Sequence, residues 1–519
     1  MSIAFLVALP PAVLFAGTLL CFVTPGQRPR LSQVFGEIAA FLAFISATAL
    51  GVYLAIHGAL SFQLFQYAFM RLAFRIDVLS VAMAVLVSFV GWIVVRYAAS
   101  YLDGENRQGS FTAWLLMTLG SVMLLVLAGD LSQLVISWIA TSLCIHKLLL
   151  FYVDRPTARK AARKKFIVAR ASDVALLGGA LLLGRAYGTG DIASILDAAR
   201  QTLGGASACW AAGLLAVAAA LKSAQFPAHG WLTEVMETPT PVSALLHAGV
   251  VNAGGFLLIR FADVLVLSPG TLAALAIVGG FTALYGSVVM LTQPAVKTSL
   301  AWSTVAQMGF MIMECGLGLF PLALLHIIAH SLYKAHSFLA CGGAVERIVA
   351  SRRLGGVAIP DAGAVTKGFV VALAIYGAVG VFFGFLHKPP QAVALGAILI
   401  FGVAYLFAQG FADLAPRPLA LRTTLYAVAT SMSYFILQSI ASSLTGNALP
   451  SPPAPGPLQW VLIGIAVISF VLVAVLQSLL PLWANHPAVA GLRVHISNGF
   501  YLNALFDRAI GGWNVRSRI

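Results

Sequence analysis

Charged residues are scarce in this sequence: Asp, Glu, Lys and Arg make up 9% of its 519 residues, against about a quarter in soluble domains. The mean hydropathy is +0.94. This composition excludes a water-soluble enzyme and indicates a protein that lies largely within a lipid bilayer. Acidic residues are the scarcer kind, with 17 against 31 basic residues. We attribute the excess of positive charge to membrane orientation rather than to nucleic-acid binding.

Cysteines are few and scattered, with five in the chain and neither a CxxC pair nor a Cys–His ligand spacing. We therefore expect no disulfide framework and no structural metal. The sequence also lacks a P-loop, a GxGxxG segment that opens a helix, and a nucleophile elbow. We expect no cofactor in this chain, and we expect it not to be an enzyme.

Long apolar runs separated by helix-breaking residues predict about fifteen membrane-spanning helices. The expected spans are 3–23, 32–57, 77–95, 111–128, 131–152, 165–184, 208–224, 240–260, 270–292, 299–319, 321–345, 366–386, 391–411, 420–444 and 458–482. Segment 488–515 mixes apolar and polar residues and is expected to be an amphipathic helix on the membrane surface. The first run lacks a basic start, so we expect a retained span rather than a cleaved signal peptide. The predicted fold class is an all-α polytopic membrane protein.

Basic residues between these spans predict the orientation, because Lys and Arg accumulate on the cytoplasmic side. They are concentrated in the odd-numbered loops and at the C-terminus. We expect a multi-pass protein of the cell inner membrane with its N-terminus outside and its C-terminus in the cytoplasm. The most basic loop, DRPTARKAARKK at 154–165, is predicted to be a cytoplasmic topology anchor that also touches anionic lipid.

A broken helix is predicted in residues 222–249, KSAQFPAHGWLTEVMETPTPVSALLHAG. One helix ends at Lys222, breaks at Pro227, resumes, turns at 238–241 and re-enters the membrane with His247. Interrupted helices expose backbone groups at membrane depth and are tolerated where they line a polar cavity. This pattern predicts that a cavity of this kind lies beside Lys222.

Lys222 is predicted to carry protons, because a buried lysine exchanges its proton when a neighbouring charge changes. The alternative is a lysine that snorkels from a helix end to the membrane surface. Glu234 and Glu237 are candidate neighbours of Lys222, and both could equally be solvated at the cytoplasmic mouth.

A polar stripe is predicted within HIIAHSLYKAHSF, where His326, His330 and Lys334 recur every fourth residue and share one helix face, with His336 turned away. Imidazoles and an amine in an apolar helix can pass protons along it. Two alternatives stay open: the two histidines could bind zinc, although no third ligand is evident, or they could satisfy helix-packing hydrogen bonds.

Three further signals are weaker. Arg170 and Asp173 are three residues apart and can form an ion pair, which is either structural or allows Asp173 to modulate the charge of Lys222. Lys297 begins a span and either needs a partner in the bundle or is a cytoplasmic anchor. Glu314 is an isolated acidic residue in its span.

Three segments, KSAQFPAHGWLTEVMETPTPVSALLHAG, KTSLAWSTVAQMGF and HIIAHSLYKAHSFLACGG, resemble the membrane subunits shared by respiratory complex I and the multisubunit cation/proton antiporters. The resemblance covers residues 70–345. It implies two inverted five-helix repeats, each with a broken helix and a half-channel. The expected domains are N-terminal helices at 1–110, a first repeat at 111–262, a second repeat at 263–445, and a last span with an amphipathic tail at 446–519.

The same resemblance assigns roles to individual residues. Lys222 matches the central lysine of the family, His247 the histidine of the next helix, Lys297 the lysine that links the two halves, and Asp173 an acidic position in the sixth helix. The stripe of His326, His330 and Lys334 matches the family's histidine–lysine stripe. These residues are the predicted proton path, with Glu237, Arg170, His336 and Lys388 as lesser candidates.

Two departures from the family pattern are evident. The family pairs its central lysine with a glutamate in a motif resembling W-E-G, where this chain reads Trp138-Ile139-Ala140. In the second repeat, Lys388 in FLHKPPQA is only a loose match to the family's lysine. The usual lysine–glutamate pairing is therefore not expected here.

The sequences of two segments, HAGVVNAGGFLLIR and HSLYKAHSFLACGG, are most similar to those of the DabB membrane subunits of the DAB inorganic carbon accumulation systems. That resemblance implies conduction of protons or another cation down their gradient to drive a cytoplasmic partner, DabA, which resembles a zinc β-carbonic anhydrase. Zinc is accordingly expected in the partner. The alternatives are a proton-translocating subunit of a complex I-like NADH-quinone oxidoreductase, a sodium/proton antiporter subunit, and a passive scaffold.

Overall fold

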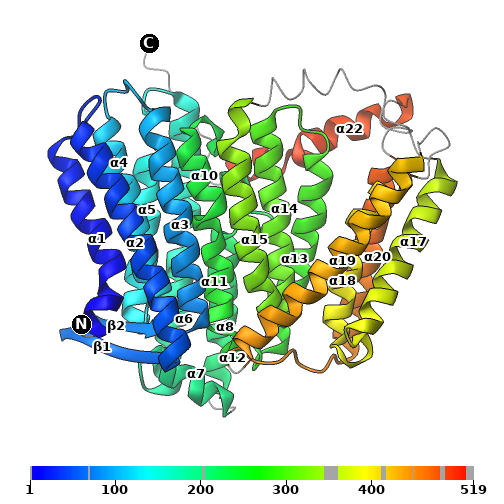
Figure 1. Cartoon of the computed structure of the whole chain (residues 1–519), viewed down its shortest axis with the longest axis horizontal. Coiled ribbons are helices and arrows are strands. Elements are labelled where there is room, and N and C mark those ends of the chain that lie inside the picture. Colours follow the sequence, from blue (N-terminus) through cyan, green and yellow to red (C-terminus); the bar gives the residue numbers. More distant parts are fainter. Residues whose placement is uncertain are drawn as a thin grey trace.

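The protein is a bundle of long helices that run side by side, with short elements at both ends of the bundle (Figure 1). The computed structural model describes residues 3–67, 70–201, 205–343, 361–410, 417–446, 448–479 and 486–509. At this level the expectation of a largely helical membrane protein is confirmed.

The first part of the bundle is formed by helices whose sequences are apolar runs, and two of these helices begin after a capping carboxylate. Asp77 accepts a hydrogen bond from the Ser80 amide, and Asp130 accepts one from the Ser132 amide, so each carboxylate caps a helix. The helices are α1 (Ile3–Val23), α2 (Arg30–His57), α3 (Val78–Tyr101), α4 (Gln108–Val126), α5 (Leu131–Leu149), α6 (Pro156–Tyr187) and the short α7 (Ile192–Arg200).

A β-hairpin corrects the expectation of an all-α fold. β1 (Leu60–Tyr67) pairs antiparallel with β2 (Met70–Ile76) at the lower left of Figure 1. In β2, Phe74 and Ile76 are buried, whereas Arg75 between them is partly exposed. This alternation has the period of a strand, and hydropathy averaged over the length of a helix conceals it.

The helix that was predicted to break after Lys222 is broken in the structure. Its pieces are α8 (Gly205–Lys222), the single turn α9 (Gly230–Thr233), α10 (Thr240–Ala248), α11 (Ala253–Arg260) and α12 (Ala262–Leu265). The expected continuous span 240–260 is interrupted as well, by a 3₁₀ turn over Val250–Asn252. Asn252 Nδ2 donates to the Ala248 carbonyl at 3.1 Å, which satisfies one backbone acceptor released by this second break.

The second part of the bundle lies to the right of α10 and α11 in Figure 1. Its helices are α13 (Pro269–Met290), α14 (Val296–Gly316), α15 (Phe320–Leu339), α17 (Ala362–Phe382), α18 (Pro390–Gly410), α19 (Arg417–Thr445) and α20 (Pro457–Ser478). Prolines stand at the first turns of α13, α15 and α20, where a missing amide hydrogen costs no helix hydrogen bond.

Glycines bring α13 and α14 into backbone contact. A Cβ at Gly279 or Gly286 would overlap the backbone of α14, and one at Gly309 or Gly316 would overlap that of α13. Small residues at such spacing allow close approach of helices in membranes. The two helices therefore pack along most of their length.

Eleven helices among the described residues are long and apolar enough to cross a membrane. The predicted spans 299–319, 321–345, 391–411 and 420–444 form α14, α15, α18 and α19, but these helices are not among the eleven. In α15 the reason is the polar stripe itself, since imidazole and amine groups lower the hydropathy of a helix that the bundle surrounds. The count of about fifteen spans is not confirmed, and the part of 321–345 after residue 343 lies outside the described residues.

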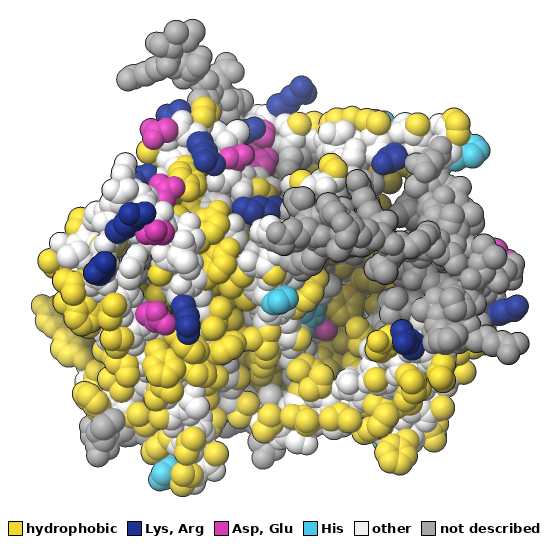
Figure 2. Space-filling view, turned by 45° about the horizontal axis from the view of Figure 1, so that its top comes forward, with side chains coloured by type: hydrophobic (Ala, Val, Ile, Leu, Met, Phe, Trp, Pro, Cys, Tyr) yellow, Lys and Arg dark blue, Asp and Glu magenta, His cyan; other side chains and the backbone are white. Residues whose placement is uncertain are grey.

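Two short helices, α22 (Ala490–Ser497) and α23 (Leu502–Ala509), form the described part of the expected segment 488–515. Figure 1 shows α22 across the top ends of the long helices, opposite the hairpin. In Figure 2, charged side chains gather toward the upper face and a broad hydrophobic surface lies below them. This distribution fits an apolar belt in lipid with a charged face in water.

Candidate functional site

Lys222 lies at the end of α8, buried against α5. Its Nζ donates to Ser142 Oγ at 3.0 Å and lies 4.4 Å from the centroid of the Trp138 ring. The ring face offers a cation some electrostatic stabilisation. Ile139, which stands where the resemblance leads one to expect a glutamate, lies one helix turn before Ser142 on α5. A hydroxyl and an aromatic ring, not a carboxylate, are therefore the contacts of Lys222 with α5.

Lys165 is a second buried lysine at this site, which the sequence reasoning missed. Its Nζ donates to the carbonyl oxygen of Ser142 at 2.7 Å. The expected span 165–184 begins at Lys165, but α6 begins at Pro156, so this lysine lies well inside the helix. The signal that would have found it is its spacing of eight residues from Asp173, which places both on one helix face.

Arg170 and Asp173 form the expected ion pair, with 2.6 Å between Nη2 and Oδ2. Asp173 is buried and Arg170 is one-third exposed. The carboxylate also attracts the ammonium group of Lys222. Asp173 is thus close enough to influence Lys222, and its charge is already shared with Arg170.

The two glutamates after Lys222 have other partners. Glu237 pairs with Arg155 at 3.3 Å, and both side chains are about half exposed. Glu234 accepts from Lys164 Nζ at 2.8 Å. Both glutamates therefore lie among the basic residues at the start of α6 rather than against Lys222.

The stripe on α15 has the geometry that its spacing predicts. The ring centroids of His326 and His330 are 6.1 Å apart, and Lys334 follows one turn later. His330 and Lys334 are buried, whereas His336 is exposed and turned away. Neither ring nitrogen of His330 has a hydrogen-bond partner among the described residues, so this imidazole is free to exchange protons in either tautomer.

A carboxylate from α14 lies at one end of the stripe. Glu314 Oε2 is 3.0 Å from His326 Nδ1, and the Glu314 side chain is 5% exposed. The sequence indicated only an isolated acidic residue here, because the contact depends on how α14 and α15 pack. Glu314 is therefore a candidate proton carrier, which the sequence alone did not predict.

At the other end, Lys334 is linked to His247 of α10. Lys334 Nζ and Thr304 Oγ1 each donate to the carbonyl oxygen of Leu300 at 3.0 Å. His247 Nδ1 lies 3.0 Å from Thr304 Oγ1, and its ring stacks on Phe338. Because the Thr304 hydroxyl hydrogen points to Leu300, the imidazole is the donor in its contact with Thr304.

Polar groups also line the helix breaks that lie between Lys222 and the stripe on α15. Ser223, next to Lys222, donates through Oγ to the Val251 carbonyl at 2.8 Å. Asn252 Nδ2 donates to Ser331 Oγ at 2.8 Å, and Ser331 follows His330 on α15. The interrupted helix therefore supplies a polar connection from the end of α8 to the stripe.

Two candidates lie apart from these contacts. Lys297 is partly exposed in the first turn of α14. Lys388 lies in the connection between α17 and α18, with Nζ 5.6 Å from the centroid of the Phe435 ring.

In the described ranges, no group of three His, Cys, Asp or Glu side chains is placed to hold a metal ion.

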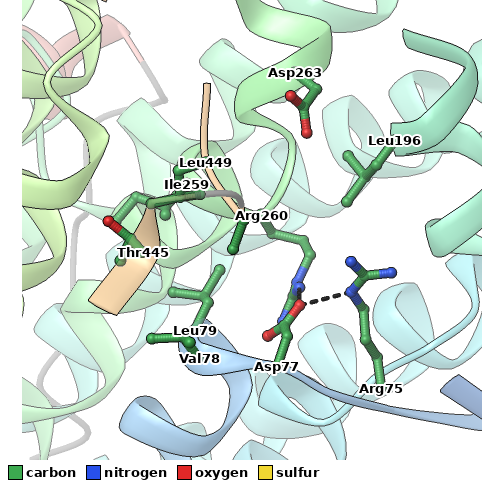
Figure 3. A pocket seen from close by; sticks show the side chains of 11 residues that line it. Arg75, Asp77, Val78, Leu79, Leu196, Ile259, Arg260, Asp263, Thr445 and Leu449 are labelled. Carbon is green, nitrogen blue, oxygen red and sulfur yellow. Dashed lines mark hydrogen bonds and ion pairs between the residues drawn. The ribbon is translucent and has the colours of Figure 1, made fainter. Parts of the chain in front are cut away.

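An ion-pair cluster lies at the hairpin end of the bundle, beside a cavity between α3, α7, α11 and α19 (Figure 3). Arg260 Nη1 and Arg75 Nε lie 2.5 and 2.6 Å from the same oxygen of Asp77. Burial opposes ionisation of Asp77, but the two guanidinium groups outweigh it and hold the pKa of Asp77 below its ordinary value. This cluster joins the hairpin to the broken helix.

A second cluster fixes α23 at the opposite end. Asp507 forms ion pairs with Lys164 Nζ at 2.7 Å and with Lys160 Nζ at 3.0 Å. Burial raises the pKa of the Asp507 carboxyl, but the two lysines outweigh it, so the pKa lies below its ordinary value. Asn503 Nδ2 lies 3.4 Å from Thr233 Oγ1. The described C-terminal helix thus packs over the segment that follows Lys222.

Comparison with protein families gives two matches. Residues 128–409 match the family described as NADH:quinone oxidoreductase/Mrp antiporter, TM. Residues 65–112 match the family described as NADH-Ubiquinone oxidoreductase (complex I), chain 5 N-terminus. The first match contains Lys222, His247 and the stripe.

Individual relatives are also similar to this chain. A protein of Halothiobacillus neapolitanus named "Probable inorganic carbon transporter subunit DabB2" is 37% identical over 85% of this chain and 80% of its own length. One of Hydrogenovibrio crunogenus named "Probable inorganic carbon transporter subunit DabB" is 45% identical over 57% of this chain, which spans 58% of that relative. In the solved structure of an Mrp complex from a Dietzia species, one chain is 25% identical with a TM-score of 0.65, over 98% of this chain and 59% of that one.

Proposed function

We propose a function from one premise: this chain belongs to the family of membrane subunits shared by NADH:quinone oxidoreductases and Mrp antiporters. On that premise, we propose that it is the membrane subunit of an inorganic carbon accumulation complex. It conducts protons, or another cation, down their gradient through the bilayer. The names of the relatives, inorganic carbon transporter subunits, support this assignment.

The observation that carries the proposal is the buried contact of Lys334 with His247 through the Leu300 carbonyl and Thr304. Charged groups at membrane depth cost about 3 kcal/mol on insertion scales and usually mark ion paths. No carboxylate forms an ion pair with Lys334 among the described residues, so its ammonium group is not locked in the charged form.

The path begins outside the cell and ends in the cytoplasm. Protons pass between Glu314 and the stripe, reach His247, and continue along the polar groups of the breaks to Lys222. A neutral imidazole accepts a proton at one nitrogen and releases one at the other, which suits His326 and His330 to transfer along a helix. Each amine carries the proton as ammonium between transfers.

The partner that uses this movement is a cytoplasmic subunit of the DabA kind, which resembles a zinc β-carbonic anhydrase. In this arrangement zinc and the hydration of CO2 belong to the partner, and this chain is its ion-driven motor. The candidate docking surfaces are the exposed arginines of the basic segment 154–165, which forms the start of α6, and the amphipathic segment 488–515. Thr238 and Thr240 are buried, so the turn between them, a candidate from the sequence, offers little surface to a partner. The N-terminus faces outside and the C-terminus faces the cytoplasm.

Replacement of Lys222 by Ala tests the ion-driven role. The variant is expected to assemble with its partner but to abolish carbon uptake by cells that depend on this system. Replacement of Lys147, an exposed lysine on α5, by Ala is the matched control and is expected to leave uptake intact. Normal uptake by an assembled Lys222→Ala protein would refute the role and favour a passive scaffold.

A pull-down from detergent-solubilised membranes, with mass spectrometry and zinc analysis, tests the partner. A soluble zinc protein in roughly equal amount supports the carbon complex. Co-purification of several other polytopic subunits contradicts it.

The likeness to a chain of an Mrp complex makes an antiporter or complex I-type subunit the second candidate. A sodium/proton antiporter subunit would show sodium-dependent activity and protect cells from salt. A respiratory subunit would co-purify with flavin and iron–sulfur proteins.

A further inference from the structure

Two lysines from different helices converge on one residue of a third helix. Lys222 of α8 donates to the hydroxyl of Ser142, and Lys165 of α6 donates to the carbonyl of the same residue. Lys165 is 5% exposed and Lys222 is 6% exposed. Ser142 on α5 is therefore the contact between two amines that are both removed from solvent.

The charges around this pair do not balance if both amines are protonated. Asp173 is the carboxylate that attracts both lysines, and it is already paired with Arg170 at 2.6 Å. The other titratable neighbours of Lys165, Cys144 and His146 on α5, carry no negative charge in their protonated and neutral forms.

The rest of α5 does not supply the missing charge. Its sequence, LSQLVISWIATSLCIHKLL, contains no acidic residue. Like charges held close together in a medium of low polarity repel strongly. The site therefore favours one ammonium and one neutral amine.

We propose that Lys165 is a further proton-carrying residue, which exchanges one proton with Lys222 across Ser142. The proposal rests on the function proposed above and adds a residue to the path. In the exchange, an N–H bond of the Lys222 ammonium breaks as its proton passes to Ser142 Oγ, and the hydroxyl proton forms a new N–H bond at Lys165. The products are neutral Lys222 and a Lys165 ammonium, with no other reactant.

The exchange requires one movement. The Lys165 amine has to turn from the Ser142 carbonyl, which it contacts at 2.7 Å, to the hydroxyl of the same residue, which Lys222 contacts. Lys165 then stands next to Lys164, which contacts Glu234 and Asp507 at the charged end of α6. This position places Lys165 between Lys222 and the cytoplasmic mouth.

The competing interpretation is structural: Lys165 is a fixed cation that ties α6 to the Ser142 carbonyl. Arginine separates the two, because a guanidinium remains a cation and a donor but does not release its proton. Lys165→Arg therefore preserves a fixed cation and removes a proton carrier. Ser142→Ala tests the hydroxyl through which the proton would pass. It removes this hydroxyl and retains the carbonyl that Lys165 binds.

The experiment measures proton flux, driven by a pH gradient, into liposomes that contain the full chain with its co-purified partner. Lys165→Arg and Ser142→Ala are expected to lower the flux at least tenfold. Lys147→Arg, the same exchange at an exposed site on α5, is expected to leave it unchanged. Size-exclusion profiles confirm that each variant is assembled, and Ser142→Ala keeps the test decisive if Lys165→Arg does not assemble.

The outcomes separate the two proposals. If the wild-type protein conducts and Lys222→Ala does not, but both Lys165→Arg and Ser142→Ala conduct normally, the role of Lys165 is refuted and the proposed function stands. If the wild-type protein itself carries neither protons nor sodium, the proposed function fails, and the role of Lys165 fails with it.

Discussion

Glu314 Oε2 lies 3.0 Å from His326 Nδ1, so a buried carboxylate of α14 contacts the first histidine of the stripe on α15. The contact joins two helices that are adjacent in sequence and packed together. Glu314 thus places a buried carboxylate within hydrogen-bond distance of the stripe, at the end farthest from Lys334.

The first prediction concerns this carboxylate. Glu314→Gln retains the size of the side chain but removes the carboxylate, so this end of the stripe loses a group that can accept a proton. Proton flux in liposomes is expected to fall by about tenfold, the effect of about 1.4 kcal/mol on the barrier. Glu37→Gln, which alters a glutamate of α2 that pairs with Arg96 near the surface, is the control. Equal flux in both variants would show that Glu314 is structural.

The second prediction concerns Thr304, which connects Lys334 to His247. Thr304→Val keeps the shape of the side chain and leaves the buried His247 Nδ1 without its partner. An unsatisfied buried polar group costs about 1–3 kcal/mol, so the free energy of unfolding in detergent is expected to fall by about that amount, together with the flux. Thr304→Ser retains the hydroxyl and should preserve both. A Val variant as stable and active as the Ser variant contradicts the connection.

The third prediction is the pH dependence of the attachment of α23. Because Lys164 and Lys160 hold the pKa of Asp507 below its ordinary value, the carboxylate stabilises the attachment at pH values above that ordinary value, about 3.9. The stabilisation is lost as the pH falls through the lowered pKa. The protection of residues 502–509 against hydrogen exchange, relative to the intrinsic exchange rate at the same pH, is therefore expected to be high between about pH 7 and 5 and to fall below about pH 4.

Asp507→Asn is the matched variant for this measurement. It removes the charge at every pH, so residues 502–509 should exchange faster than in the wild-type protein already at neutral pH. Equal protection of both proteins at neutral pH would mean that apolar packing, not the two ion pairs, holds α23.

The fourth prediction concerns the Asp77 cluster. Asp77→Asn leaves Arg260 buried without its counter-charge, which is expected to cost about 3–5 kcal/mol in the free energy of unfolding. Replacing Asp77 and Arg260 together, by Asn and Gln, should cost less than the sum of the two single changes. Additive single effects, measured by unfolding in detergent, would show that the pair is not coupled.

The sequence predicted the long helices well, because apolar runs and Pro or Gly punctuation set their limits. The span expected at 270–292 is α13 (Pro269–Met290), and the break after Lys222 falls where Pro227 suggested it. The interruption after Ala248 escaped prediction. Its apolar sequence reads as continuous helix, and the polar contacts that stabilise the turn, such as Asn252 with Ser331, come from other helices.

Candidate site residues were predictable only where spacing along one helix contains the information. His326, His330 and Lys334 share a face because they are four residues apart. The carbonyl of Leu300 has no sequence signature, since every residue has a carbonyl. Lys165 was hidden by an error of nine residues in the start of α6, which made a buried lysine look like part of a surface cluster.

The glycine contacts between α13 and α14 have a consequence for motion. With backbones touching at Gly279 and Gly309, α13 packs directly against α14, the helix that carries Glu314 and the Leu300 carbonyl, and leaves it little room to shift. On the proposed function, a rearrangement during conduction is therefore expected at the facing helix, α15, whose His326 and Lys334 contact these two groups.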